Sequence, residues 1–117
     1  MSIDITIRSV EGAVIVAPHG DVDLTTSDLL RSVVDRVIDD GATAVVLDLC
    51  DVGFMDSTAL GVLVLFHRRL GTGLVVAAAQ PGVHRLFEIT RFTAVLRLAD
   101  SVATALTALR TRRSGPA

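Results

Sequence analysis

Ser57 stands where a hydroxyl could be modified chemically. It lies between an apolar run that ends at Cys50 and a second apolar run that begins at Leu60. If the first run is a buried strand and the second a helix, Ser57 follows the carboxyl end of a strand, where open sheets collect their sites. A helix N-terminus has unpaired amides and a positive dipole end. A phosphate on Ser57 would therefore be accommodated locally.

Two other interpretations of Ser57 stay open on the residues alone. Serine is a good N-cap, so Ser57 would only start its helix. The strand–turn–helix setting also resembles a nucleophile elbow, which needs Gly two residues on either side of the serine. Met55 and Ala59 occupy those positions, and no His or acid stands out as a base.

Asp21 and Asp23 form a second polar feature, in the segment Gly20–Asp23 that follows a strand and precedes a helix. Two carboxylates in a loop are usually a solvated turn. They could also flank a site on the same edge of the sheet as Ser57.

The remaining chemistry-bearing residues point to no metal, redox or nucleic-acid function. Cys50 is the only cysteine and is expected to be a small buried hydrophobe, because Leu49 and Val52 beside it are apolar. The histidines are far apart, so neither a metal site nor a cofactor is expected. They are His19, His67 and His84. Basic residues cluster only at Arg110, Arg112 and Arg113, without Trp or Tyr, so nucleic-acid binding is not expected.

Hydrophobic periodicity predicts a mixed sheet of about five strands covered by about four helices, an α/β fold. The strands are expected at 3–8, 13–17, 44–50, 74–79 and 94–98. The helices are expected from Thr25 to Gly41, over 57–70, around Val83–Phe87, and from Asp100 or Ser101 to Leu109. The first two strands form a hairpin and the rest alternate with helices.

Local signals set several of these boundaries. Thr25 with Asp28 three residues later has capping-box spacing, with Asp in place of Glu. Pro18 is expected to stop the second strand, and Pro81 with Gly82 to form a turn before the third helix.

Length and composition predict one domain at 1–110, followed by a flexible tail at 111–117. The chain has 117 residues, of which 50% are hydrophobic and 21% charged, so a core can be buried. The longest apolar stretch, Ala59–Phe66, is too short to cross a membrane. The N-terminus alternates polar and apolar residues, unlike a signal peptide. We therefore expect a cytoplasmic protein without membrane contact.

Three segments resemble the STAS family, and specifically its stand-alone bacterial anti-sigma factor antagonists. Phe54–Leu63 is similar to the family's Met-Asp-Ser-Ser/Thr-Gly-Leu-Gly signature. Gly20–Asp23 resembles its Gly-acid-apolar-Asp loop, and Pro81–Phe87 the start of its third helix. Two departures are Ala59, where the family usually has Gly, and Arg91-Phe92, where it commonly has Gly-Leu.

The resemblance implies a STAS fold and a non-enzymatic role in partner switching that regulates transcription, as in stress response or sporulation. The unphosphorylated protein would bind an anti-sigma factor, which is often an ATP-dependent serine kinase, and so release the sigma factor. Phosphorylation would end binding, and a serine phosphatase would reset it. Ser57 is the implied phosphorylation site, with Thr58 as the alternative. The implied neighbours are Asp21, Asp23 and Asp56, and the implied partner contacts are Asp23, Ser57, Thr58, Ala59 and Gly61.

The extra methyl of Ala59 beside Ser57 could crowd a kinase or a partner. Two other functions remain: a STAS scaffold or sensor subunit of a larger signalling assembly, and a STAS module that binds a small molecule.

Overall fold

The computed structural model describes residues 3–113, and within this range five strands form one mixed sheet in the order β1-β2-β3-β4-β5. The strands are β1 (Asp4–Val10), β2 (Ala13–His19), β3 (Val45–Asp48), β4 (Leu74–Ala77) and β5 (Leu98–Ala99). β1 and β2 form an antiparallel hairpin, and the other neighbours are parallel. The predicted hairpin followed by strand–helix alternation is confirmed.

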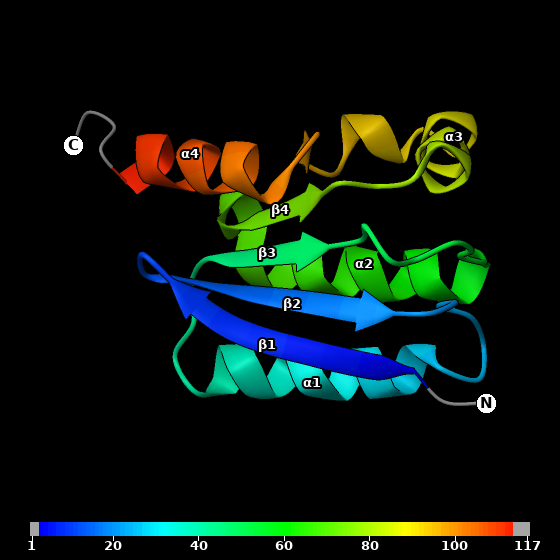
Figure 1. Cartoon of the computed structure of the whole chain (residues 1–117), viewed down its shortest axis with the longest axis horizontal. Coiled ribbons are helices and arrows are strands. Elements are labelled where there is room, and N and C mark those ends of the chain that lie inside the picture. Colours follow the sequence, from blue (N-terminus) through cyan, green and yellow to red (C-terminus); the bar gives the residue numbers. More distant parts are fainter. Residues whose placement is uncertain (1–2, 114–117) are drawn as a thin grey trace.

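Helices cover both faces of this sheet. They are α1 (Ser27–Asp39), α2 (Ser57–Leu70), α3 (Pro81–Ile89) and α4 (Val102–Arg113), with short 3-10 turns η1 (Gly71–Gly73) and η2 (Phe92–Ala94). In Figure 1 the arrowheads of β2, β3 and β4 point to the same end of the molecule, and α1 and α2 begin at that end. The carboxyl ends of these strands and the starts of the two helices therefore lie at one edge of the sheet, as predicted for the site.

The two faces have separate cores. Side chains of α1, α2 and α3 bury the larger core, including Leu63, Phe66 and Phe87, all at 0% exposure. Ala105 and Leu109 of α4 cover the smaller core on the opposite face. Each large apolar side chain buried in this way stabilises the fold by about 1.5–3 kcal/mol. α2 is thus firmly held by its inner face, and only its outer face is free to interact.

Pro18 does not stop β2, which continues to His19. The backbone of Pro18 pairs with Ile5 of β1, whereas β3 pairs with β2 only as far as Val16. Because proline lacks an N–H, it is tolerated in a strand where that donor has no ladder partner.

Other boundaries also differ from the sequence-based expectation. Pro81 is the first residue of α3, where its fixed φ suits a helix start. The last strand is two residues long at Leu98–Ala99, and the 3-10 turn η2 occupies Phe92–Ala94. α4 extends through Arg112 to Arg113, beyond the expected domain end at 110. Residues 114–117 of the expected tail lie outside the described residues.

Among residues 3–113, the helices are all too short or too polar to cross a bilayer.

Candidate functional site

Two loops lie side by side at the carboxyl edge of the sheet. The loop after β2 donates from Gly20 N to Asp51 O at 3.1 Å and from Val22 N to Phe54 O at 3.0 Å. Val22 and Met55 form a parallel bridge, so β2–β3 pairing resumes beyond the strand ends. The two acidic loops expected to converge around Ser57 are therefore in direct contact.

Asp56 joins these loops to α2. It is the N-cap of the helix, and its Oδ1 accepts a hydrogen bond from Ala59 N at 3.0 Å. Its Oδ2 accepts from Leu24 N at 3.0 Å. Because one carboxylate satisfies a helix amide and a loop amide together, Asp56 fixes the loop before α1 relative to the first turn of α2.

Ser57 is the first residue of α2, and its side chain is exposed. Asp56 supplies the side-chain cap, so the interpretation of Ser57 as the N-cap is wrong. Thr58 and Gly61 are also exposed. The Ser57 hydroxyl is therefore free for modification beside a helix N-terminus, which favours a negative group.

Ala59 does not lie on this surface. It is 1% exposed and belongs to the larger core under the helix. The expectation that its methyl group crowds a partner, and its place among the partner contacts, are therefore corrected: the methyl points into the protein.

Asp23 organises its own loop. Its Oδ1 accepts hydrogen bonds from Thr25 Oγ1 at 2.8 Å, Thr25 N at 2.9 Å and Thr26 Oγ1 at 3.2 Å. The Thr25 hydroxyl is the first cause that lowers the pKa of Asp23 below its ordinary value, followed by the Thr25 amide. Among the hydrogen bonds of residues 3–113, none joins Asp23 to Ser57, although their loops touch.

The predicted capping box is also wrong. α1 begins at Ser27, with Thr26 as N-cap and no side-chain cap from Asp28. Asp23 takes the organising role, three residues before Thr26. Asp21 is exposed nearby, with its Oδ1 3.9 Å from the point where a Cβ on Gly53 would lie.

Leu24 and Phe54 are exposed apolar side chains of these loops that sequence reasoning missed. Leu24 is 72% exposed and Phe54 is 51% exposed. Phe54 also lines an open groove of about 240 Å³ whose wall includes Leu86 of α3. Because the two loops that carry these exposed apolar side chains are in contact, this edge is a candidate interaction surface. The only sequence signal was that both stand in loops instead of in a periodic apolar face.

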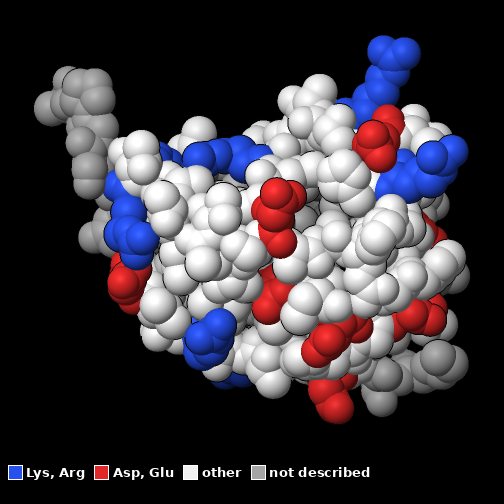
Figure 2. Space-filling view, turned by 45° about the horizontal axis from the view of Figure 1, so that its top comes forward, with Lys and Arg blue, Asp and Glu red and all other residues white. Residues whose placement is uncertain are grey.

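The same edge carries negative charge. The segments 20–23 and 51–56 contain four aspartates and no basic residue. Figure 2 shows acidic side chains gathered over the lower right of the face drawn, with basic ones mainly along its left and upper margins. A phosphate on Ser57 would add charge to an edge that is already negative.

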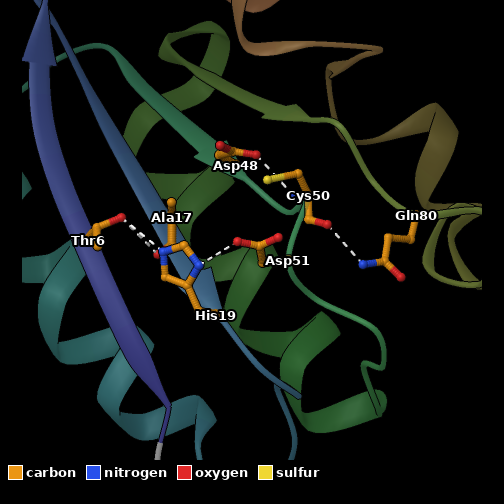
Figure 3. A network of polar contacts seen from close by, with 7 residues as sticks. All are labelled: Thr6, Ala17, His19, Asp48, Cys50, Asp51 and Gln80. Atoms are coloured by element: carbon orange, nitrogen blue, oxygen red, sulfur yellow. Dashed lines mark hydrogen bonds and ion pairs between the residues drawn. The ribbon is translucent and has the colours of Figure 1, made fainter.

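Cys50 is exposed, which corrects the expectation that it is buried. It lies two residues after Asp48, whose Oδ1 accepts a hydrogen bond from the backbone N–H of Cys50 at 3.1 Å (Figure 3). Partial desolvation raises the pKa of the Cys50 thiol to about 11, and the nearby Asp48 and Asp51 add to the rise.

Alkylation needs the thiolate, and the higher nucleophilicity of a more basic thiolate only partly offsets its low population. Cys50 should therefore react with iodoacetamide at pH 8 at least about tenfold more slowly than an ordinary thiol. Mass spectrometry from pH 7 to 11 should show the rate rising throughout that range. In urea the unfolded chain should react at the ordinary rate. A midpoint near the usual thiol value of about 8.5 in the folded protein would contradict this environment.

Within residues 3–113, no three His, Cys, Asp or Glu side chains come together in a way that could hold a metal ion.

Comparison with known sequences gives a family match. The STAS domain model matches residues 4–105. A protein of Paenibacillus polymyxa named anti-sigma F factor antagonist is 31% identical over 113 residues, which cover 93% of this chain and 97% of that protein.

Several solved structures are also similar to this chain. A crystal structure of an anti-sigma factor antagonist from Mycobacterium paratuberculosis has a TM-score of 0.86 and 30% identity, and covers 92% of this chain and 94% of that one. The anti-sigma factor antagonist SpoIIAA shares the fold in its unphosphorylated form, with a TM-score of 0.68, 19% identity, and coverage of 97% of this chain and 100% of that one. Its phosphorylated form also shares the fold, with a TM-score of 0.67, 17% identity, and coverage of 89% and 97%.

Proposed function

The chain belongs to the STAS domain family, and we propose that it is an anti-sigma factor antagonist switched by phosphorylation of Ser57. The match of the STAS domain model confirms the family resemblance of the sequence. The names of similar proteins support the antagonist function. The observation that carries the switch is the exposed Ser57 at the start of α2, next to the loops that hold Leu24 and Phe54.

In this proposal the unphosphorylated protein binds an anti-sigma factor through the outer face of α2 and the two loops. Leu24 and Phe54 supply apolar contact, and Ser57, Thr58 and Gly61 allow close approach of the partner. The partner is an ATP-dependent serine kinase that modifies Ser57, and a serine phosphatase reverses the modification. The protein acts in the cytoplasm as ligand and phosphorylation substrate, not as an enzyme.

Capture from a lysate of the native host tests the proposal directly. Tagged wild-type protein should retain an anti-sigma factor, and adding ATP to that complex should place one phosphate on Ser57. Ser57→Ala should retain the same partner without accepting phosphate. Capture of no anti-sigma factor would refute the antagonist function, and phosphate on Thr58 instead would refute the site.

Phe54→Ala should weaken binding of the captured anti-sigma factor by at least about fivefold, because an aromatic anchor in an interface contributes more than about 1 kcal/mol. Its thermal midpoint should stay within a few degrees of wild type, since half of the side chain is already in water. Titration calorimetry and thermal melts measure the two effects.

Val95→Ala is the matched control. Val95 is 45% exposed and lies between η2 and β5, outside α2 and the two loops of the proposed surface. Its removal should leave affinity unchanged. Equal losses for the two variants would show that Phe54 is not a specific contact.

A further inference from the structure

A polar network outside the Ser57 surface holds the loop that leads to it. His19, the last residue of β2, places its Nδ1 2.7 Å from Asp51 Oδ2. Its Nε2 lies 3.1 Å from Thr6 Oγ1 on β1. Figure 3 shows the imidazole lying between Thr6 and Asp51, so it links the edge strand to the loop after β3.

The hydrogen-bond chemistry fixes the role of each ring nitrogen. A carboxylate only accepts, so Nδ1 must carry the hydrogen that Asp51 receives. In the neutral ring, Nε2 then accepts from the Thr6 hydroxyl. In the protonated ring, Nε2 donates to Thr6, whose hydroxyl can turn to Ala17 O at 3.4 Å. The contact with Asp51 is therefore retained in both protonation states.

Asp51 is the point at which this loop meets β2. Its backbone carbonyl accepts from Gly20 N at 3.1 Å while its side chain meets His19. One residue earlier, Cys50 O accepts from Gln80 Nε2 at 2.9 Å, which ties the loop to the start of α3. Gly53 and Phe54 beyond are exposed, and the next ties to the β2–α1 loop are those of Phe54 and Asp56 to Val22.

We propose that His19 is a positioning residue, which holds the loop from Asp51 to Asp56 against the β2–α1 loop and so presets the surface around Phe54 and Ser57. The significance of that surface rests on the proposed function, but the holding does not. Because the side chains of His19 and Asp51 are 34% and 58% exposed, their contact adds little to global stability. Its effect is expected on local opening, which involves fewer contacts than unfolding.

Hydrogen exchange on full-length variants tests this. His19→Gln places an amide near the Nε2 position and loses the donor to Asp51. It should speed exchange of the Gly20, Val22 and Asp56 amides about two- to fivefold, the range for an exposed pair. The Val76 amide, which donates to Arg97 O in the sheet, should not change. His19→Asn, whose amide sits near the Nδ1 position, should restore slow exchange.

His84→Gln is the matched control, because His84 Nδ1 faces Glu88 at 3.3 Å on α3. It should leave these loop amides at the wild-type rate. Binding affinity should respond in the same way. The affinity for the anti-sigma factor recovered from the host should fall about two- to fivefold in His19→Gln, the range for loss of an exposed pair, and should recover in His19→Asn.

Unchanged loop exchange in His19→Gln would overturn the proposal, as would equal acceleration at Val76, which would indicate general destabilisation. Faster loop exchange with unchanged partner affinity would overturn the link to the Ser57 surface. If wild-type protein binds no anti-sigma factor, the proposed function fails, and the exchange rates still decide whether His19 holds the loop.

Discussion

Phosphorylation of Ser57 should weaken binding of the anti-sigma factor by at least about tenfold, equivalent to 1.4 kcal/mol. The phosphate adds about −1.5 to −2 charges at neutral pH. It would enter an edge whose two loops already carry four aspartates. In a contact surface, such a charge is both repelled and costly to remove from water. Calorimetric titration of the phosphorylated and unphosphorylated proteins measures the difference.

The same modification should leave the fold intact. Ser57 is the first residue of α2, where a negative group is favourable by about 0.3–1 kcal/mol. Behind it, Leu63 and Phe66 anchor the helix at 0% exposure. Circular dichroism should be unchanged and the thermal midpoint should shift by no more than a few degrees.

Variants separate charge from shape at this position. Ser57→Asp should reproduce only part of the loss, because a carboxylate has less charge and fewer acceptor oxygens than a phosphate. Thr58→Ala should still be phosphorylated and should still switch. Phosphorylated protein that unfolds, or that binds as tightly as before, would overturn this mechanism.

The central elements could be predicted because their apolar runs are long and their capping residues are local. β3 and α2 lie where the runs before Cys50 and after Leu60 placed them. Aspartate is a residue type that favours the N-cap position, and Asp56 is the N-cap of α2. The loops after β2 and β3 lie at one edge of the sheet because parallel strands end together, so their common position could be predicted from the strand order.

The start of α1 could not be predicted in the same way. Asp28 has capping-box spacing from Thr25, yet Asp23 makes the hydrogen bonds. The β2–α1 loop is fixed by its pairing with Met55, more than thirty residues away in the sequence. Spacing within one helix contains no information about that contact.

Exposure was the other quantity beyond reach of the sequence. Cys50 and Phe54 stand among apolar neighbours, and composition alone places such residues in the core. The chain leaves β3 after Asp48, however, so the burial on both faces that covers Val45, Val46 and Leu47 does not extend to Cys50. The exposure of Cys50 and Phe54 is therefore seen only in the three-dimensional structure, as is the His19–Asp51 contact.

Gly73→Ala should destabilise the fold by about 3 kcal/mol or more, although it adds only one methyl group. A Cβ on Gly73 would lie 2.0 Å from the backbone carbonyl oxygen of Thr43 and 3.2 Å from its carbon. These are backbone atoms next to the start of β3, so they cannot rotate away as a side chain would. Either β4 or the α1–β3 connection must shift, which disturbs the pairing of the two central strands.

Urea unfolding and thermal melts measure this cost, and a midpoint lower by about 10 °C is expected for a domain of this size. Gly61→Ala is the matched control, because a Cβ there would meet nothing within 4 Å. Gly61 lies inside α2, so alanine should stabilise the free protein by about 0.5–1 kcal/mol through helix propensity. Equal stability of Gly73→Ala and wild type would show that the approach of Thr43 to Gly73 is not required by the packing of β3 against β4.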